Sequence, residues 1–143
     1  MSIIFNNADS RVTLTNRTTL KEFITKQVRK EGIIIIDLQY IFCSDKYLLE
    51  INRKFLEHDY YTDIISFDLS EEKGKLIAEV YISIDRVKDN AKSLHTTLQE
   101  ELLRVIFHGA LHFCGYKDKK QKEAVLMREM ENTWIKAYQK VLG

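Results

Sequence analysis

The sequence contains no proline, two cysteines and five glycines among its 143 residues. Cys43 and Cys114 are too few for a framework of disulfide bonds, which favours a reducing compartment such as the cytoplasm. No apolar stretch approaches the length of a membrane-spanning helix, and the N-terminus lacks the basic and then apolar pattern of a signal peptide. We therefore expect a cytoplasmic protein that does not insert into a membrane.

The sequence also has almost equal numbers of positive and negative side chains. Lys and Arg total 22, Asp and Glu total 21, and the formal net charge is +1. The overall charge therefore does not indicate a nucleic-acid binder, although local basic clusters can still serve that purpose. Hydrophobic residues make up 45% of the chain and charged residues 30%, which is typical of a soluble globular protein. At this length we expect a single domain spanning residues 1–143.

Hydrophobic periodicity predicts strands and helices in the order βαβαββααα. We expect Asp85 to cap the third helix, Phe55 to face the core from the second, and Leu126 to lie on the apolar face of the last. This order predicts an α+β (mixed α/β) fold, with a roughly four-stranded mixed sheet packed against helices. The expected strands are 3–6, 32–43, 64–69 and 76–84, and the expected helices are 18–30, 46–56, 85–93, 97–112 and 119–142.

The stretch from Val105 to Asp118, V-I-F-H-G-A-L-H-F-C-G-Y-K-D, carries the strongest chemical signal. His108 and His112 lie four residues apart, so on a helix they share one face, one turn above the other. Gly115 is suited to end that helix, because glycine adopts the left-handed conformation without a Cβ penalty. The spacing H-x-x-x-H-x-x-G-x-x-D matches the motif of metzincin-like zinc hydrolases, with Asp in place of the third His. It predicts a zincin-like site on a central helix.

Two imidazoles on such an apolar helix need a partner, because their burial costs free energy unless something pairs with them. One Zn²⁺ ion would be that partner. Cys114 lies about 200° round the helix from His112 and is expected to face away from the ion. His58 and His95 lie farther off, and nothing in their spacing requires them. We therefore expect three ligands from the motif and a water molecule, as in catalytic zinc sites, whereas a fourth protein ligand would indicate a structural zinc.

Gly109 separates this motif from that of the zinc peptidases. Those enzymes carry Glu directly after the first His as the general base, and here that position is glycine. A metallopeptidase or small-molecule hydrolase is thus an alternative that the spacing permits and Gly109 argues against. A metal ion at this site would acidify a water molecule and polarise a phosphoryl or carbonyl oxygen.

Three blocks of the sequence resemble the YbeY family of bacterial rRNA maturation factors. The segment H-G-A-L-H-F-C-G-Y-K-D, which begins at His108, is similar to the family signature H-G-x-L-H-x-x-G-Y-D-H. Residues 51–67 end in T-D-I-I-S-F and resemble a family block with the core T-D-V-L-S-F. Residues 76–84, L-I-A-E-V-Y-I-S-I, resemble the family's G-D-I-x-I-S strand. The blocks occur in the family's order and cover roughly residues 33–131.

This resemblance implies a zinc-dependent, single-strand-specific endoribonuclease that hydrolyses RNA phosphodiesters in the cytoplasm. It further implies a role in 16S rRNA 3′-end processing and ribosome quality control, with precursor rRNA and the ribosomal small subunit as partners. The metal ligands carry over to His108, His112 and Asp118, where Asp replaces the family's third His with a harder oxygen ligand. A ribosome assembly factor with a structural metal is a further alternative. The oligomeric state is left open.

The catalytic residues are less well defined than the ligands. The family's Arg before the T-D block corresponds to Leu56, and Arg53, about one helical turn earlier, is a candidate replacement. Asp63, Glu79 and Asp118 itself are candidates for the general base by residue type alone. Lysines just past the motif can track phosphates or form an ordinary solvated surface, and loop tyrosines can stack on bases or pack against the core. These residues are Lys117, Lys119, Lys120, Lys122, Tyr60, Tyr61 and Tyr116.

Overall fold

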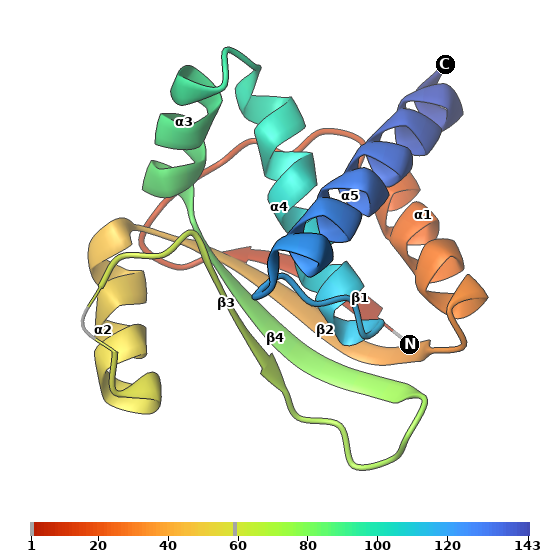
Figure 1. The fold of residues 1–143 in the computed structure, drawn as a ribbon, viewed down its shortest axis with the longest axis horizontal. Helices are drawn as coiled ribbons and strands as arrows, with labels where there is room; N and C mark the ends of the chain where they lie inside the picture. Colours follow the sequence, from red (N-terminus) through yellow and green to blue (C-terminus); the bar gives the residue numbers. More distant parts are fainter. Residues whose placement is uncertain (1, 59) are drawn as a thin grey trace.

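A computed structural model describes residues 2–58 and 60–143, which form a four-stranded sheet and five helices (Figure 1). The element order is the predicted βαβαββααα. The strands are β1 Ser2–Asn7, β2 Ile34–Cys43, β3 Ile64–Asp68 and β4 Lys75–Ser83. The helices are α1 Arg17–Lys30, α2 Asp45–Leu56, α3 Ile84–Ser93, α4 Leu98–Phe113 and α5 Gln121–Leu142.

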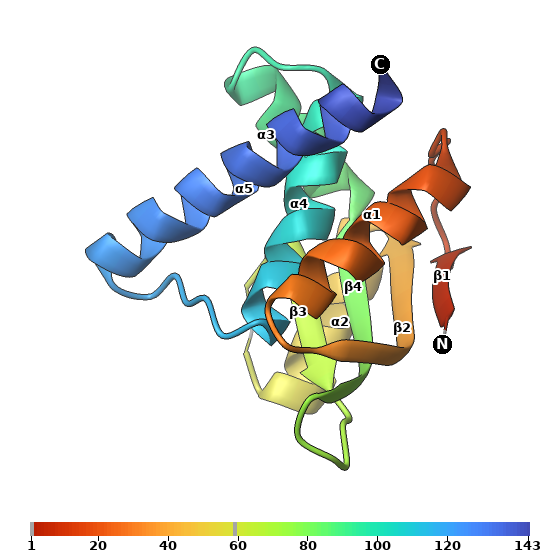
Figure 2. The same ribbon diagram turned by 90° about the vertical axis from the view of Figure 1, so that its right-hand side faces the viewer.

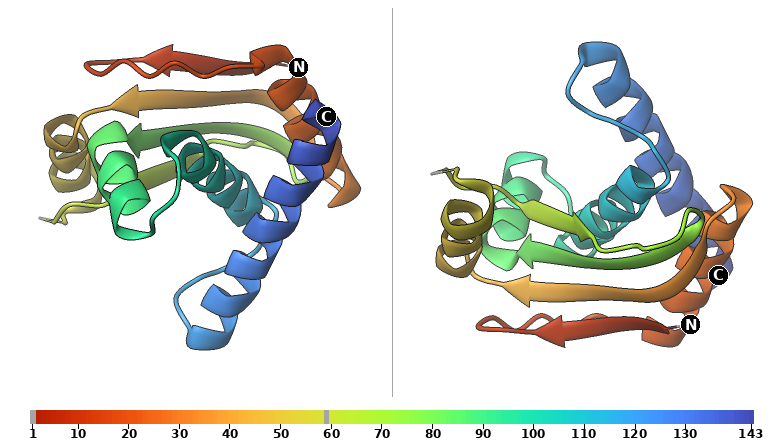
Figure 3. Two further views of the ribbon diagram at one scale, coloured as in Figure 1. Left: turned by 90° about the horizontal axis from the view of Figure 1, so that it is seen from above. Right: turned by 90° about the horizontal axis from the view of Figure 1, so that it is seen from below.

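The sheet is mixed, as predicted. Its strand order is β1-β2-β4-β3, with β1, β2 and β4 parallel and β3 antiparallel to β4. Side chains alternate between the two faces of a strand. On β4 the buried residues on the α4 side include Leu76, Ala78 and Val80, whereas Glu79 and Tyr81 point to the opposite face. Figure 3 shows α4 lying over the sheet while the first turns of α5 project away from it.

Helix α4 forms the centre of the fold and supplies much of the hydrophobic core. It packs against β3 and β4, and α1, α3 and α5 pack around it (Figure 2). Phe107 of α4 is fully buried and meets the rings of Phe23, Trp134 and Tyr138 at centroid distances of 5.5, 5.6 and 6.1 Å. Each such buried aromatic side chain stabilises the fold by about 1.5–3 kcal/mol, so α4 is a rigid element on which to place functional groups.

Three predictions about single residues are wrong. Helix α3 is capped by Ser83, whose hydroxyl accepts a hydrogen bond from the Arg86 amide, while the Asp85 carboxylate accepts one from the amide of Asp45. Phe55 is 62% exposed, because α2 packs against the sheet through its earlier turns. Leu126 is 48% exposed and lies in the second turn of α5, which begins at Gln121.

None of the helices in the described part of the chain is both long enough and apolar enough to span a membrane.

Candidate metal centre

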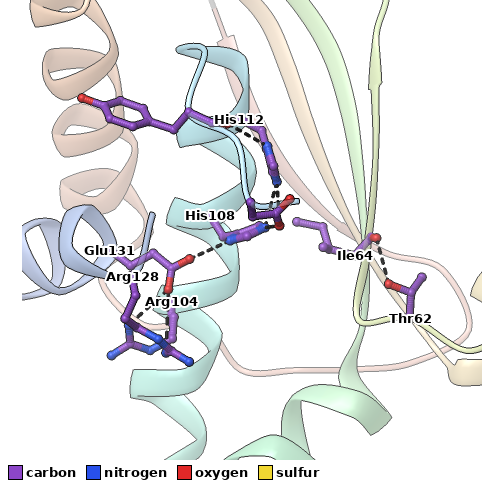
Figure 4. Close-up of polar contacts among 9 residues, drawn as sticks. Thr62, Ile64, Arg104, His108, His112, Arg128 and Glu131 are labelled. Atoms are coloured by element: carbon purple, nitrogen blue, oxygen red, sulfur yellow. Dashed lines mark hydrogen bonds and ion pairs between the residues drawn. The ribbon is translucent and has the colours of Figure 1, made fainter. Parts of the chain in front are cut away.

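Helix α4 positions the two histidines of the motif. Thr97 caps the helix by accepting a hydrogen bond from the Glu100 amide. The helix then continues without a break to Phe113, so His108 and His112 project from successive turns of one face. Their Nε2 atoms lie 2.9 Å apart, and their side chains are 20% and 31% exposed. Figure 4 shows the two rings pointing toward one another.

A glycine turn brings the third residue of the motif to the same place. Gly115 has a φ of 99°, in the left-handed region that glycine adopts readily, and it ends α4 as predicted. The following Tyr116 amide donates to the Leu111 carbonyl at 3.1 Å, which holds the reversed chain against the helix. Asp118 Oδ2 then lies 3.2 Å from His108 Nε2 and 3.3 Å from the corresponding atom of His112.

Hydrogen bonds on the far side of each ring determine which nitrogen faces this cluster. His112 Nδ1 lies 3.0 Å from the Tyr116 carbonyl oxygen, and His108 Nδ1 lies 2.6 Å from Glu131 Oε2. A carbonyl oxygen and a carboxylate only accept hydrogen bonds, so each Nδ1 is the donor. In the neutral imidazole each Nε2 then carries a lone pair rather than a proton. Metal-ligating histidines are commonly oriented in this way.

This geometry fits a bound cation. Two imidazole lone pairs and one carboxylate oxygen face each other within 3.3 Å, an arrangement that is repulsive until a positive charge lies between them. Ligands about 2.0–2.1 Å from a tetrahedral zinc ion are separated by about 3.3 Å, close to the three separations measured here. Among the described residues, one group of side chains can hold a metal ion, and it consists of His108, His112 and Asp118.

Glu131 supports the cluster from α5 and was not among the site residues predicted from the sequence. Its carboxylate is 4% exposed and also contacts Arg104 at 3.2 Å and Arg128 at 3.8 Å (Figure 4). The sequence does contain a signal: Glu131 lies four residues after Met127 and four before Ile135, on the buried stripe of α5. A carboxylate at such a position needs a charged or hydrogen-bonding partner.

The electrostatic field at His108 favours positive charge. Burial by itself lowers the pKa of this imidazole, but the hydrogen bond and charge of Glu131, joined by the charges of Asp118 and Asp63, raise it further than burial lowers it. The net shift of the His108 pKa is therefore upward. The same three carboxylates would stabilise a metal cation at Nε2, because a cation and a bound proton are both positive charges at that atom.

A cavity of about 440 Å³ lies beside the cluster, bounded by α3, α4 and α5. Asp63 lines it together with His108 and Asp118, and burial raises the pKa of the Asp63 carboxyl. The other two candidate catalytic residues lie elsewhere. Glu79 points to the opposite face of the sheet, where it accepts a hydrogen bond from the Tyr81 hydroxyl, and Arg53 is an exposed residue of α2. Only Asp63 of these three shares the cavity with the cluster.

The other two histidines and Cys114 lie outside the cluster. Cys114 is half-buried against the core, and burial raises the pKa of its thiol to about 12. His58 stacks on Tyr60 and contacts its hydroxyl at 2.9 Å, and His95 is exposed. The Tyr116 hydroxyl donates to Glu31 rather than facing solvent freely. Tyr60, Tyr61 and the four lysines that follow the motif are exposed.

Gly109 lies where α4 comes closest to the sheet. A Cβ atom there would lie 3.2 Å from Ile64 Cδ1 and 3.3 Å from Val80 Cγ1. Any longer side chain would therefore collide with β3 and β4. A glutamate at this position would meet the sheet instead of the metal site, so the general base of a zinc peptidase has no place here.

We expect the Gly109→Leu substitution to lower the free energy of unfolding by about 1–3 kcal/mol, because overpacking outweighs the gain in helix propensity. Urea denaturation measures this loss. Leucine in place of the exposed Glu129 on α5 is the control, and it should change stability by less than about 0.5 kcal/mol. Equal stability of both variants would mean that α4 does not pack against the sheet at Gly109.

The fold and the site together define a class of protein. It is an α+β protein whose central helix carries two histidines of a candidate metal site and whose following loop carries the carboxylate. The family model described as Endoribonuclease YbeY matches residues 3–139, and the chain belongs to this family.

Curated relatives agree with this assignment over most of the chain. The chain is 51% identical over 131 residues to the endoribonuclease YbeY of Cytophaga hutchinsonii, and the match covers 92% of each protein. It is 42% identical over 132 residues to that of Parabacteroides distasonis, again covering 92% of each. The solution structure of TM1509 from Thermotoga maritima has a TM-score of 0.63 at 27% identity, covering 99% of this chain and 91% of that one.

Proposed function

We propose that this protein is a zinc-dependent endoribonuclease that hydrolyses phosphodiester bonds in single-stranded RNA. The observation that carries the proposal is the convergence of His108, His112 and Asp118, with both Nδ1 atoms held by acceptors. Membership of a family whose relatives are named endoribonucleases supplies the substrate class. A bound zinc ion would polarise a phosphoryl oxygen and acidify a water molecule.

The chain's own residues have separate tasks in this proposal. His108 and His112 present their Nε2 atoms to the ion, and Asp118 contributes negative charge to it. Glu131 keeps His108 in the required tautomer. We assign the role of proton acceptor to Asp63, whose carboxyl group lines the neighbouring cavity together with His108 and Asp118. The exposed lysines that follow the motif attract the phosphates of the substrate strand.

We further propose that the substrate is precursor rRNA, cleaved in the cytoplasm during maturation of the 16S 3′ end on the small ribosomal subunit. The support is the family assignment together with the motif blocks that resemble the rRNA maturation factors. The cavity beside the cluster favours a catalytic metal ion over a purely structural one, because a structural ion has no need of an adjacent open cavity.

Metal removal tests the proposed activity. Protein stripped with a strong chelator should cleave single-stranded RNA about 10³-fold more slowly, since the ion contributes several kcal/mol to transition-state stabilisation. One equivalent of Zn²⁺ should restore the rate. Chelator already saturated with zinc is the control and should leave cleavage unchanged. Full cleavage by the metal-free protein would refute the metal dependence, and no cleavage by the zinc-loaded protein would refute the nuclease assignment.

A further inference from the structure

The cavity beside the metal centre extends well past the three ligands. It runs between α3, α4 and α5 and is also lined by residues that the proposed reaction does not use. Its volume of about 440 Å³ falls in the range of about 300–1,000 Å³ that is usual for ligand sites. These additional lining residues include Glu101, Arg104, Val105 and Met127.

Glu101 is the unusual member of this wall. It is 4% exposed, and its Oε1 is the single buried side-chain oxygen or nitrogen in residues 2–58 and 60–143 that has no hydrogen-bond partner. Arg104 Nε lies 3.8 Å away, which is too far for a hydrogen bond. Burial raises the pKa of Glu101, although the charges of Arg104 and Arg128 oppose that shift. Arg104 therefore balances the charge of this carboxylate as an ion pair. Its Oε1 nevertheless accepts no hydrogen bond, and leaving a buried acceptor without a donor is costly.

The other residues that line the cavity indicate what kind of hydrogen-bond donor can bind beside Glu101. Val105, Met127 and Leu94 offer apolar surface, and Asn90 and Ser93 add polar groups at the α3 side. A flat ring with apolar faces and an N–H group at its edge matches this combination. The terminal torsion of glutamate is broad, so a small rotation can direct the Glu101 carboxylate toward such an edge.

We propose that this cavity binds the nucleobase next to the scissile phosphate and that Glu101 accepts a hydrogen bond from the exocyclic amino group of that base. This inference rests on the proposed function, since it assigns a base-binding subsite to the same RNA-cleaving centre. It predicts that adenine, cytosine and guanine are preferred over uracil. Uracil has no amino group, and the two carbonyl oxygens that flank its N3–H are repelled by the carboxylate.

Binding of RNA analogues, with their integrity checked on a gel after each measurement, tests the subsite separately from catalysis. The probes are short fluorescent 2′-O-methyl oligonucleotides, either all uridine or with one central adenosine, cytidine or guanosine, and the readout is fluorescence anisotropy with the full chain. The wild type should bind the amino-bearing probes about tenfold more tightly than the all-uridine probe. The isosteric Glu101→Gln variant should reduce this preference to about twofold or less, chiefly by raising the affinity for the all-uridine probe, because the amide can donate to the carbonyl oxygens of uracil.

Glu129→Gln, the same change on the exposed surface of α5, is the control and should keep the preference of the wild type. Three results would overturn the inference: no preference in the wild type, a preference that survives in Glu101→Gln, or an equal loss of affinity for every probe. Cleavage of the matching unmodified RNAs separates this inference from the proposed function. Cleavage without base preference refutes the subsite alone, whereas base-selective binding without cleavage supports the subsite and refutes the nuclease.

Discussion

The His112→Ala variant should fail to bind zinc stoichiometrically and should cleave single-stranded RNA about 10³-fold more slowly than the wild type. The substitution leaves His108 and Asp118 as the remaining ligands, and two protein ligands are too few for the three-ligand arrangement of catalytic zinc sites. Metal content by elemental analysis and cleavage of a labelled RNA oligonucleotide measure the two effects on the same preparation.

His58→Ala is the matched control for this substitution. His58 is exposed and lies outside the cluster, so this variant should keep both the metal and the activity. Intact RNA cleavage by His112→Ala would show that the cluster is not the active site. A different result would favour a structural metal: a sharp fall in the melting temperature of His112→Ala, combined with a wild type that binds zinc but cleaves no RNA.

The Glu131→Gln variant should bind zinc about 10–100-fold more weakly, because the carboxylate that orients His108 is replaced by a neutral amide. It should also lose about 3 kcal/mol of stability, since removal of one partner from a buried ion pair leaves the other without compensation. Here the partner is Arg104, whose side chain is 16% exposed and lies 3.2 Å from Glu131. Competition with a zinc-binding dye measures the affinity, and urea denaturation measures the stability.

Glu129→Gln, on the exposed side of the same helix, is again the control and should alter neither quantity. If Glu131→Gln lowered stability without changing zinc affinity, Glu131 would be a structural residue that happens to contact His108. If zinc affinity fell while stability stayed at the wild-type level, the contact between Glu131 and Arg104 would contribute little to stability. Glu131 would then act only by orienting His108.

Local patterns were enough to predict much of the fold and the placement of the candidate metal ligands. The element order is confirmed, because amphipathic periodicity and caps such as Ser44 and Thr97 act within a few residues. The spacing of His108 and His112 depends on one helix alone, and Gly115 ends that helix as expected. The resemblance to the YbeY family is confirmed as well, because its motif blocks are continuous segments of the sequence.

The features that the sequence analysis missed depend on contacts between distant segments. Glu131 meets His108 across 23 positions in the chain, and no spacing rule joins them. Phe55 contacts the ring of Phe67 on β3 but stays 62% exposed, because no other element in the described part of the chain covers it, and periodicity does not reveal such a lack of cover. Glu101 has the acidic, first-turn position of many helix starts. Only the packing of α3 and α5 around it shows that it is buried in a cavity wall.

Anomalous scattering at the zinc edge, from crystals of protein with a measured metal content, tests the central claim most directly. We expect one equivalent of zinc and a single anomalous peak about 2.0–2.2 Å from His108 Nε2, His112 Nε2 and a carboxylate oxygen of Asp118. A crystal of zinc-loaded protein with no peak between the two histidines, or with the ion held there while Asp118 points away, would contradict this claim.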